Sequence, residues 1–136
     1  MAKKTHNKND NATSSNNGVS NGVKAELRNY NQSPRKVRLV TNLVKGKSVE
    51  QALDALSFLP KRAADPVRKL IQSALANASA GGGSASGGKA IDISKLIVKN
   101  IAVDADGMTV RYMPRAQGRA TPIRRRKSRV AVTLAI

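Results

Sequence analysis

The side chains best suited to chemistry in this sequence are the cations of one short stretch near its end. Residues 113–129 read MPRAQGRATPIRRRKSR; seven of the seventeen are Arg or Lys, and none is acidic. Arginine presents a planar fork of N–H donors that pairs bidentately with phosphate and stacks on nucleobases. Such a stretch cannot form a hydrophobic core and repels itself in water, so it indicates a site for a polyanion.

The charge of the whole chain agrees with this. Its 136 residues include 25 basic and 8 acidic side chains, giving a net charge of +17. Nucleic acid is the commonest partner of such a chain, because every neutralised phosphate releases condensed counterions. An anionic membrane is the alternative, but the sequence has no run of 18 apolar residues and no helix with opposed apolar and basic faces. We therefore expect a nucleic-acid partner and no membrane.

Residues for catalysis or metal binding are sparse. The chain has no Cys, and its one histidine, His6, lies in a polar stretch, so thiolate chemistry, Cys-based metal sites and a Ser–His pair are excluded. Glu50 and Asp54 have helical spacing, but they lack a nearby cation or metal motif and read as solvated carboxylates. The sequence predicts no enzyme and no cofactor or metal.

The expected kind of nucleic acid follows from two features that the sequence lacks, a set of stacking aromatic residues and a helix-turn-helix. Three aromatic residues, Tyr30, Phe58 and Tyr112, are too few for a module that reads single strands by stacking. The helix at 33–46 has no preceding helix in a tight turn, as a reader of duplex DNA requires. Recognition of the shape and backbone of folded RNA fits better. The alternative of another class is a free architectural protein or RNA chaperone.

Two segments are expected to lie outside the packed domain. Residues 1–22 are rich in Asn, Ser, Lys and Gly without apolar periodicity, which is typical of a disordered tail. They resemble neither a secretory signal nor a transit peptide, so a solvated leader and a weak RNA-binding arm both remain open. AGGGSASGG at 80–88 is expected to be a flexible loop. The domain itself is expected at 23–136.

The first predicted helix covers 33–46. Ser33 suits an N-cap, Pro34 suits the first helical position, and Gly46 marks a stop. Arg35, Lys36 and Arg38 cluster at its start, where the macrodipole disfavours cations, so an external anion should compensate; a solvated basic turn is the alternative. Its apolar face is expected to hold Val37, Val40, Leu43 and Val44.

Two further helices are predicted. Ser48, followed three residues later by Gln, forms a capping box that opens a short helix ending at Pro60. A third helix covers about 61–79 and keeps one apolar phase over four turns. Pro66 is placed near its start, and the alternative is that Asp65 caps a shorter helix.

Strand periodicity appears at 23–30 and again from 95 onward. The apolar run 95–103, an Asp-Gly turn at 104–107 and a second strand at 108–113 are predicted. Val130 to Ile136 alternate as in a half-buried strand, and the same parity traced backward reaches Arg126 and Arg124. The strand therefore leaves the domain, which predicts a projecting hairpin at about 108–130 with its tip at 113–120.

Three segments together resemble the large-subunit ribosomal protein family twenty-two. They are SPRKVRLVTNLVKGKSVEQALDAL (33–56), PKRAADPVRKLIQSALANA (60–78) and VRYMPRAQGRATPIRRRKSRVAV (110–132). The resemblance covers 23–136. It implies an α+β fold, with three helices packed on a small antiparallel three-stranded sheet and a long protruding β-hairpin. The polar tail and the Gly/Ser loop depart from the family pattern.

The resemblance also implies a function. The chain would be a structural constituent of the large ribosomal subunit in the cytoplasm, would bind 23S rRNA and would aid subunit assembly. Its hairpin would line the nascent peptide exit tunnel, beside ribosomal protein four and the nascent peptide, and no homo-oligomer is expected. The expected hairpin tip comprises Met113, Pro114, Arg115, Ala116, Gln117, Gly118, Arg119 and Ala120. The side chains expected to meet rRNA are Arg35, Lys36, Arg38, Lys45, Lys47, Lys61, Arg62, Arg111, Arg115, Arg119, Arg124, Arg125, Arg126, Lys127 and Arg129.

Overall fold

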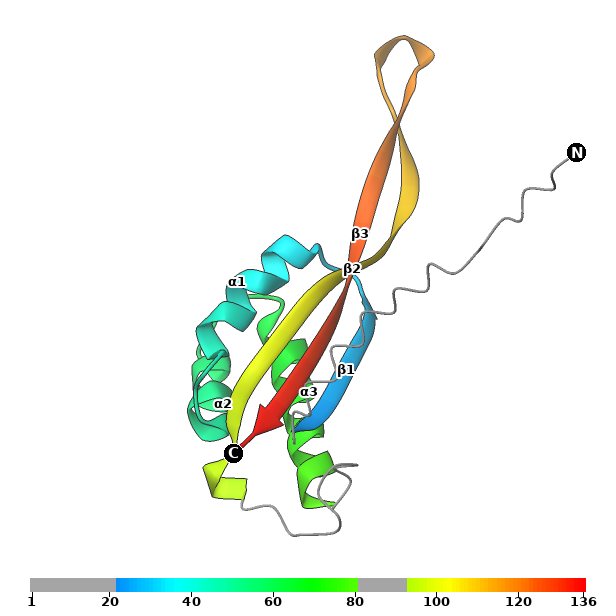
Figure 1. The fold of residues 1–136 in the computed structure, drawn as a ribbon. Coiled ribbons are helices and arrows are strands. Elements are labelled where there is room, and N and C mark those ends of the chain that lie inside the picture. The colour runs from blue at the N-terminus through cyan, green and yellow to red at the C-terminus, as the bar shows by residue number, and fades with distance from the viewer. Residues whose placement is uncertain (1–21, 81–92) are drawn as a thin grey trace, which may run out of the picture.

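The computed structural model describes residues 22–80 and 93–136 as three helices on a three-stranded antiparallel sheet (Figure 1). The strand order is β1-β3-β2, so the last strand is the central one. The α+β fold class predicted from the sequence is confirmed. The segments expected to be a tail and a loop lie, apart from Gly22 and Ala80, outside the described residues. The elements are β1 (Val23–Tyr30), α1 (Pro34–Val44), α2 (Val49–Ser57), α3 (Ala64–Ser79), β2 (Ile97–Pro114) and β3 (Ala120–Ala135).

The predicted signals mark the start of α1, its stop and the start of α2, but α2 ends at Ser57 instead of Pro60 and α3 begins three residues later than expected. α1 begins at Pro34 and is followed by Gly46 in a left-handed conformation (φ 80°), which favours glycine. At the start of α2 the Ser48 hydroxyl accepts a hydrogen bond from the backbone N–H of Gln51 at 3.4 Å. α3 begins at Ala64 with Pro66 in its first turn, and Ala63 occupies the N-cap position. The alternative in which Asp65 caps the helix is therefore wrong.

The core lies between the helices and one face of the sheet. On β3, Val130, Val132 and Leu134 are completely buried, as their alternation predicted. Opposite them lie completely or almost completely buried side chains of the helices, including Val37 and Ile71. Two predictions for this core were wrong, those for Ile136 and Leu43. Ile136 continues the alternation but is 70 % exposed, because it lies beyond Ala135, the last residue of β3.

Leu43 was expected in the core but is 51 % exposed. At about 100° per residue, Val37, Val40, Thr41 and Val44 share one face of α1, and Leu43 falls outside this face.

The predicted turn at 104–107 does not exist, because β2 continues through it as one strand of 18 residues. The pairing with β3 shifts register between Ala105 and Met108, and Gly107 has a φ of 86°. Asp-Gly therefore forms a β-bulge here. A left-handed glycine serves a bulge as well as a hairpin turn, and β3 is long enough to pair with both halves of β2.

The chain reverses instead at the predicted tip. Pro114 pairs with Ala120, and the Arg115 N–H donates to the Arg119 carbonyl oxygen at 2.7 Å. Gln117 and Gly118 supply the left-handed conformations that close the turn (φ 61° and 71°).

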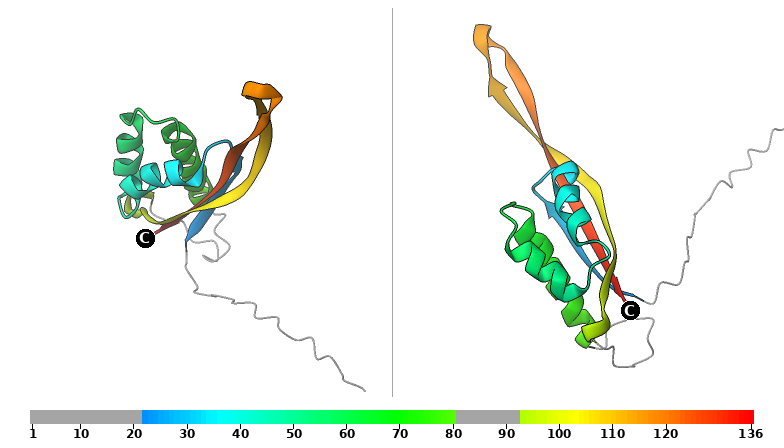
Figure 2. Two further views of the ribbon diagram at one scale, coloured as in Figure 1. Left: turned by 90° about the horizontal axis from the view of Figure 1, so that it is seen from above. Right: turned by 90° about the vertical axis from the view of Figure 1, so that its left-hand side faces the viewer.

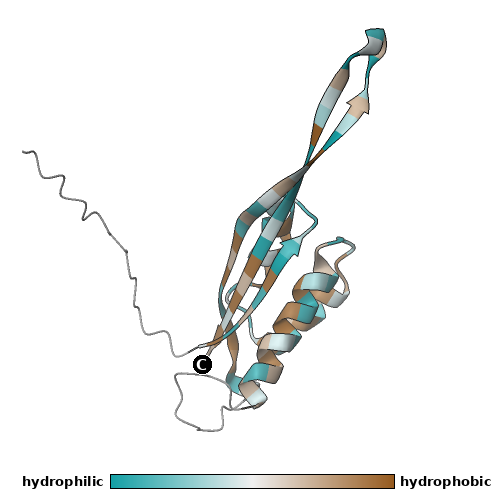
Figure 3. Cartoon of the chain, turned by 90° about the vertical axis from the view of Figure 1, so that its right-hand side faces the viewer, coloured by the Kyte–Doolittle hydropathy of each residue, from teal (hydrophilic) through white to brown (hydrophobic). Residues whose placement is uncertain are grey.

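β2 and β3 extend well beyond the helices as a two-stranded hairpin (Figure 2). The helices all cover the same face of the sheet, and the hairpin projects from one end of it. Every residue from Val110 to Arg126 is exposed. Hydrophilic and hydrophobic residues are mixed along this hairpin (Figure 3), so it has no core of its own. An isolated hairpin of this kind is marginally stable in water, so a partner is expected to support it.

Candidate nucleic-acid interface

A concavity of about 950 Å³ lies where the hairpin leaves the domain. Six of the ten residues that line it are cationic and the other four are polar and uncharged. A concave surface with charge of a single sign focuses the electrostatic potential and attracts anions. The lining residues are Asn31, Gln32, Ser33, Lys36, Arg62, Thr109, Arg111, Arg125, Arg126 and Lys127.

Four segments that are distant in sequence assemble this concavity. The first turn of α1 and the residues just before it provide one wall, and the α2–α3 connection provides Arg62. The Tyr30 hydroxyl donates to the Arg62 carbonyl oxygen at 3.2 Å, which holds that connection against the end of β1. The hairpin provides the rest: Thr109 pairs with Arg125, and Arg111 is two residues further along β2 on the same face.

The start of α1 adds to the attraction for anions. The concavity is lined by the three residues that precede α1, Asn31, Gln32 and Ser33. The N-terminus of α1, which is the positive end of the helix dipole, therefore faces the concavity. No acidic side chain lies in the first turn. Within the described residues the Ser33 hydroxyl makes no capping hydrogen bond, although its position is that of an N-cap. A phosphate group would complement both the dipole and the Lys36 ammonium.

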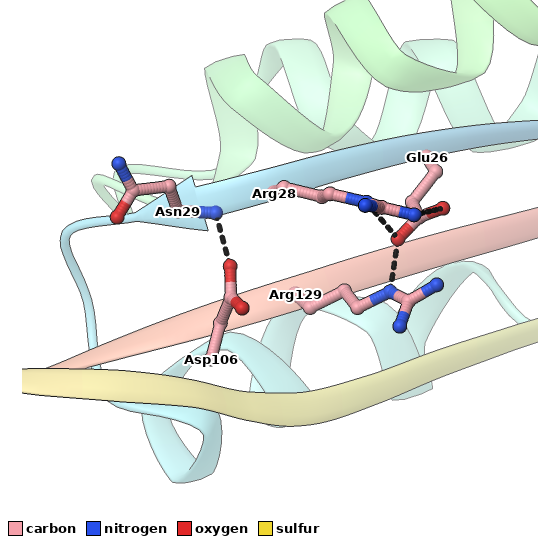
Figure 4. A network of polar contacts seen from close by, with 5 residues as sticks. All are labelled: Glu26, Arg28, Asn29, Asp106 and Arg129. Atoms are coloured by element: carbon pink, nitrogen blue, oxygen red, sulfur yellow. Dashed lines mark hydrogen bonds and ion pairs between the residues drawn. The ribbon is translucent and has the colours of Figure 1, made fainter.

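Two cations expected to meet RNA, Arg38 and Arg129, have partners on other elements of the protein. The Arg38 guanidinium donates two hydrogen bonds, at 3.1 and 2.6 Å, to the Val103 carbonyl oxygen and so ties α1 to β2. Arg129 forms an ion pair with Glu26 across the β1–β3 pair (Figure 4). Both arginines stabilise the base of the hairpin, a role that their residue type alone did not indicate.

The polar network around Glu26 joins all three strands at this base. The Glu26 carboxylate lies between Arg28 and Arg129 (Figure 4). The Arg28 Nε is 2.9 Å from the Glu26 Oε1. Hydrogen bonds from Arg28 and then Arg129 lower the pKa of Glu26 from 4.5 to about 2. Beside it the Asp106 carboxylate accepts the backbone N–H of Asn29, so the irregular parts of β1 and β2 are held together.

Glu26→Gln is expected to remove an acid-sensitive contribution to stability. Because the folded-state pKa is depressed, the carboxylate stabilises the fold above pH 4.5, and this contribution is lost as the pH falls toward about 2. Thermal unfolding followed from pH 7 downward should show a smaller loss for the variant than for the wild type over that range. Glu50→Gln, an exposed carboxylate of α2, is the control. Parallel losses in wild type and Glu26→Gln would contradict the assignment.

The remaining predicted cations are exposed, but they do not form one surface. Arg115, Arg119 and Arg124 lie on the outer hairpin. Arg35 and Lys61 lie on the two segments that also contribute Lys36 and Arg62 to the concavity.

Lys45 and Lys47 lie elsewhere, beside the first residues of β2. The neighbouring Gly46 N–H donates to the Val98 carbonyl oxygen at 2.8 Å, and the Lys47 carbonyl oxygen accepts the Val98 N–H at 2.9 Å. The structure thus brings together only part of the predicted set. Asn31, Gln32, Ser33 and Thr109 line the concavity but were not predicted as site residues. Only the adjacency of the first three to the basic helix start could have indicated them.

No helix within 22–80 and 93–136 is long and apolar enough to span a membrane. In those same ranges, no three His, Asp or Glu side chains are grouped so that they could hold a metal ion.

Comparison with known proteins gives the family. Residues 25–135 match the family described as ribosomal protein L22p/L17e. Large ribosomal subunit protein uL22 of Myxococcus xanthus is 48% identical over 111 residues, which cover 82% of this chain and 93% of that protein. The uL22 protein of Syntrophotalea carbinolica is 45% identical over 112 residues, which cover 82% of this chain and 96% of that protein. The chain therefore belongs to the ribosomal protein L22p/L17e family, a family of structural, non-enzymatic proteins of the large ribosomal subunit.

Proposed function

We propose that this chain is a structural constituent of the large ribosomal subunit that binds 23S rRNA and aids subunit assembly. The observation that carries the proposal is the concavity with six cationic side chains at the junction of hairpin and domain. Recognition there is of phosphate and shape: the lining is arginine, lysine and small polar groups, which position a backbone without reading a base sequence. Binding of this kind is sequence-tolerant and strongly dependent on salt.

The proposal extends to the hairpin. Its outer part is exposed along its whole length and carries arginines on both strands, so rRNA on both sides would neutralise it and supply the support that it lacks alone. The tip, 113–120, would then reach the wall of the nascent peptide exit tunnel, beside ribosomal protein four. Small residues at the turn, Ala116 and Gly118, would suit a surface that a peptide passes.

Shortening the hairpin tests this arrangement. Met113 pairs directly with Thr121, so residues 114–120 can be replaced by an Asn-Gly turn that closes the same two strands. We expect an unchanged unfolding temperature, because the tip contributes nothing to the core, and continued co-sedimentation with large subunits after a high-salt wash. We also expect altered passage of nascent peptides, measured by translation of arrest-prone sequences. Unfolding of the shortened chain would contradict a tip independent of the domain.

A further inference from the structure

Phe58 is the most exposed large hydrophobic side chain among the described residues, with 87 % of its surface accessible. It follows α2 directly, at the C-cap position, whereas the next residue, Leu59, packs against the core. The ring therefore makes little contribution to folding. A single exposed apolar residue is ordinary on a protein surface, so its surroundings must decide whether it has a role.

The segment that presents the ring is held by hydrogen bonds. The Leu59 N–H donates to the Leu56 carbonyl oxygen at 3.4 Å, the Lys61 N–H to that of Leu59 at 2.8 Å, and the Ala64 N–H to that of Lys61 at 2.8 Å. Pro60 fixes one backbone angle within this turn. The backbone that carries the ring is therefore already ordered, so contact with a partner costs the rotamer freedom of the side chain but little backbone freedom.

Cations follow the ring within four residues. Lys61 and Arg62 are both exposed, and Arg62 lines the concavity. A nucleotide has a phosphate group that pairs with such cations and a base with a π-face that stacks on an aromatic ring. An apolar partner protein would gain nothing from the adjacent positive charge. The combination of an exposed aromatic ring on an ordered turn and the two cations that follow it is therefore complementary to RNA.

We propose that Phe58 is a stacking platform for an unpaired nucleobase of the RNA whose backbone occupies the cationic concavity. This inference rests on the proposed function and adds a base contact to it. A phenyl ring has no donor or acceptor, so the site would select an unstacked base without selecting its identity. It would thereby recognise a loop or bulge of folded RNA at the domain side of the concavity.

A fluorescence experiment on the full chain tests the contact directly. The protein has no tryptophan, so Phe58→Trp introduces a single indole at the proposed site. Titration with large-subunit rRNA should quench its emission, because a base stacks on the indole. Ile136→Trp places an equally unique indole at an exposed position (70 %) at the far end of β3, and its emission should not change. Absence of quenching at Phe58→Trp, or quenching only when other ribosomal proteins are added, would overturn the proposal.

Affinity measurements separate this inference from the proposed function. Phe58→Ala should weaken rRNA binding about 5- to 150-fold, the loss expected for one stacked base, while Phe58→Tyr should bind like the wild type. The salt slope of Phe58→Ala should equal that of the wild type, because the net charge is unchanged, and its unfolding temperature should be the same. If Phe58→Ala bound rRNA as tightly as the wild type and kept its steep dependence on salt, the stacking site alone would be overturned. If the affinity of the wild-type chain did not depend on salt, the proposed function would be overturned.

Discussion

Replacing Arg62, Arg111 and Arg125 with Gln is expected to lower the slope of log affinity against log salt by about 2 to 3 units. The three arginines come from three different segments and line the same concavity. Removing one phosphate contact lowers the slope by about 0.7 to 0.9, so removing three corresponds to roughly 100- to 500-fold weaker binding at about 0.1 M salt. Titrations with large-subunit rRNA at several salt concentrations measure both quantities.

The control for this triple variant removes the same charge elsewhere. Lys24, Lys69 and Lys99 are exposed and lie outside the lining of the concavity. Changing them to Gln gives the same net charge as the arginine triple, since +17 less three is +14. Their effect on the slope should be clearly smaller. If the two triples behave alike, binding depends on total charge and the concavity is not the interface.

Leu134→Ala is expected to lower the free energy of unfolding by about 2 to 5 kcal/mol. Leu134 is completely buried on the central strand, where it lies opposite Val23 of β1 and Val98 of β2. Truncation removes buried apolar surface and leaves a cavity between the sheet and the helices. Small domains have only about 5 to 15 kcal/mol in total, so the variant should be close to unfolding at physiological temperature. Urea denaturation measures the change.

The matched control is Ile136→Ala, two residues further along the chain. Ile136 is 70 % exposed, so the change should be within about 0.5 kcal/mol. The arrangement would be contradicted by a decrease at Leu134 below about 1 kcal/mol. Such a result would mean that the end of β3 does not pack between its neighbours as described.

Local signals predicted much of this molecule. The alternation of Val130, Val132 and Leu134 indicated a half-buried strand, and its continuation into Arg126 indicated that the strand leaves the domain; both were confirmed. Ser48 and Gly46 marked helix ends correctly. These features follow from backbone geometry and one-sided burial, which act over a few residues and therefore leave a period or a cap in the sequence.

The same local signals failed where one backbone conformation serves two structures. A left-handed Gly107 fits both a hairpin turn and a bulge, and only pairing with a long β3 decides between them. The alternation along β3 also does not predict the position of Arg125. Neighbouring strand residues point to opposite faces, yet Arg125 and Arg126 line the same concavity. Strand twist and the bulge at Ala105 to Met108 rotate the hairpin relative to the sheet, and neither is encoded in the alternation.

The sequence by itself determined the charge, the three helices, the projecting strand and the absence of catalytic cysteine or paired histidine chemistry. The tertiary structure decided which cations share a surface. It assigned Arg38 and Arg129 to contacts within the protein. It brought Lys36 and Arg62 to one concavity with three hairpin arginines, Arg111, Arg125 and Arg126. The physical reason is that charge is a property of each residue, whereas an interface depends on distances between segments far apart in the chain. Those distances are set by packing, twist and register, which no short stretch of sequence contains.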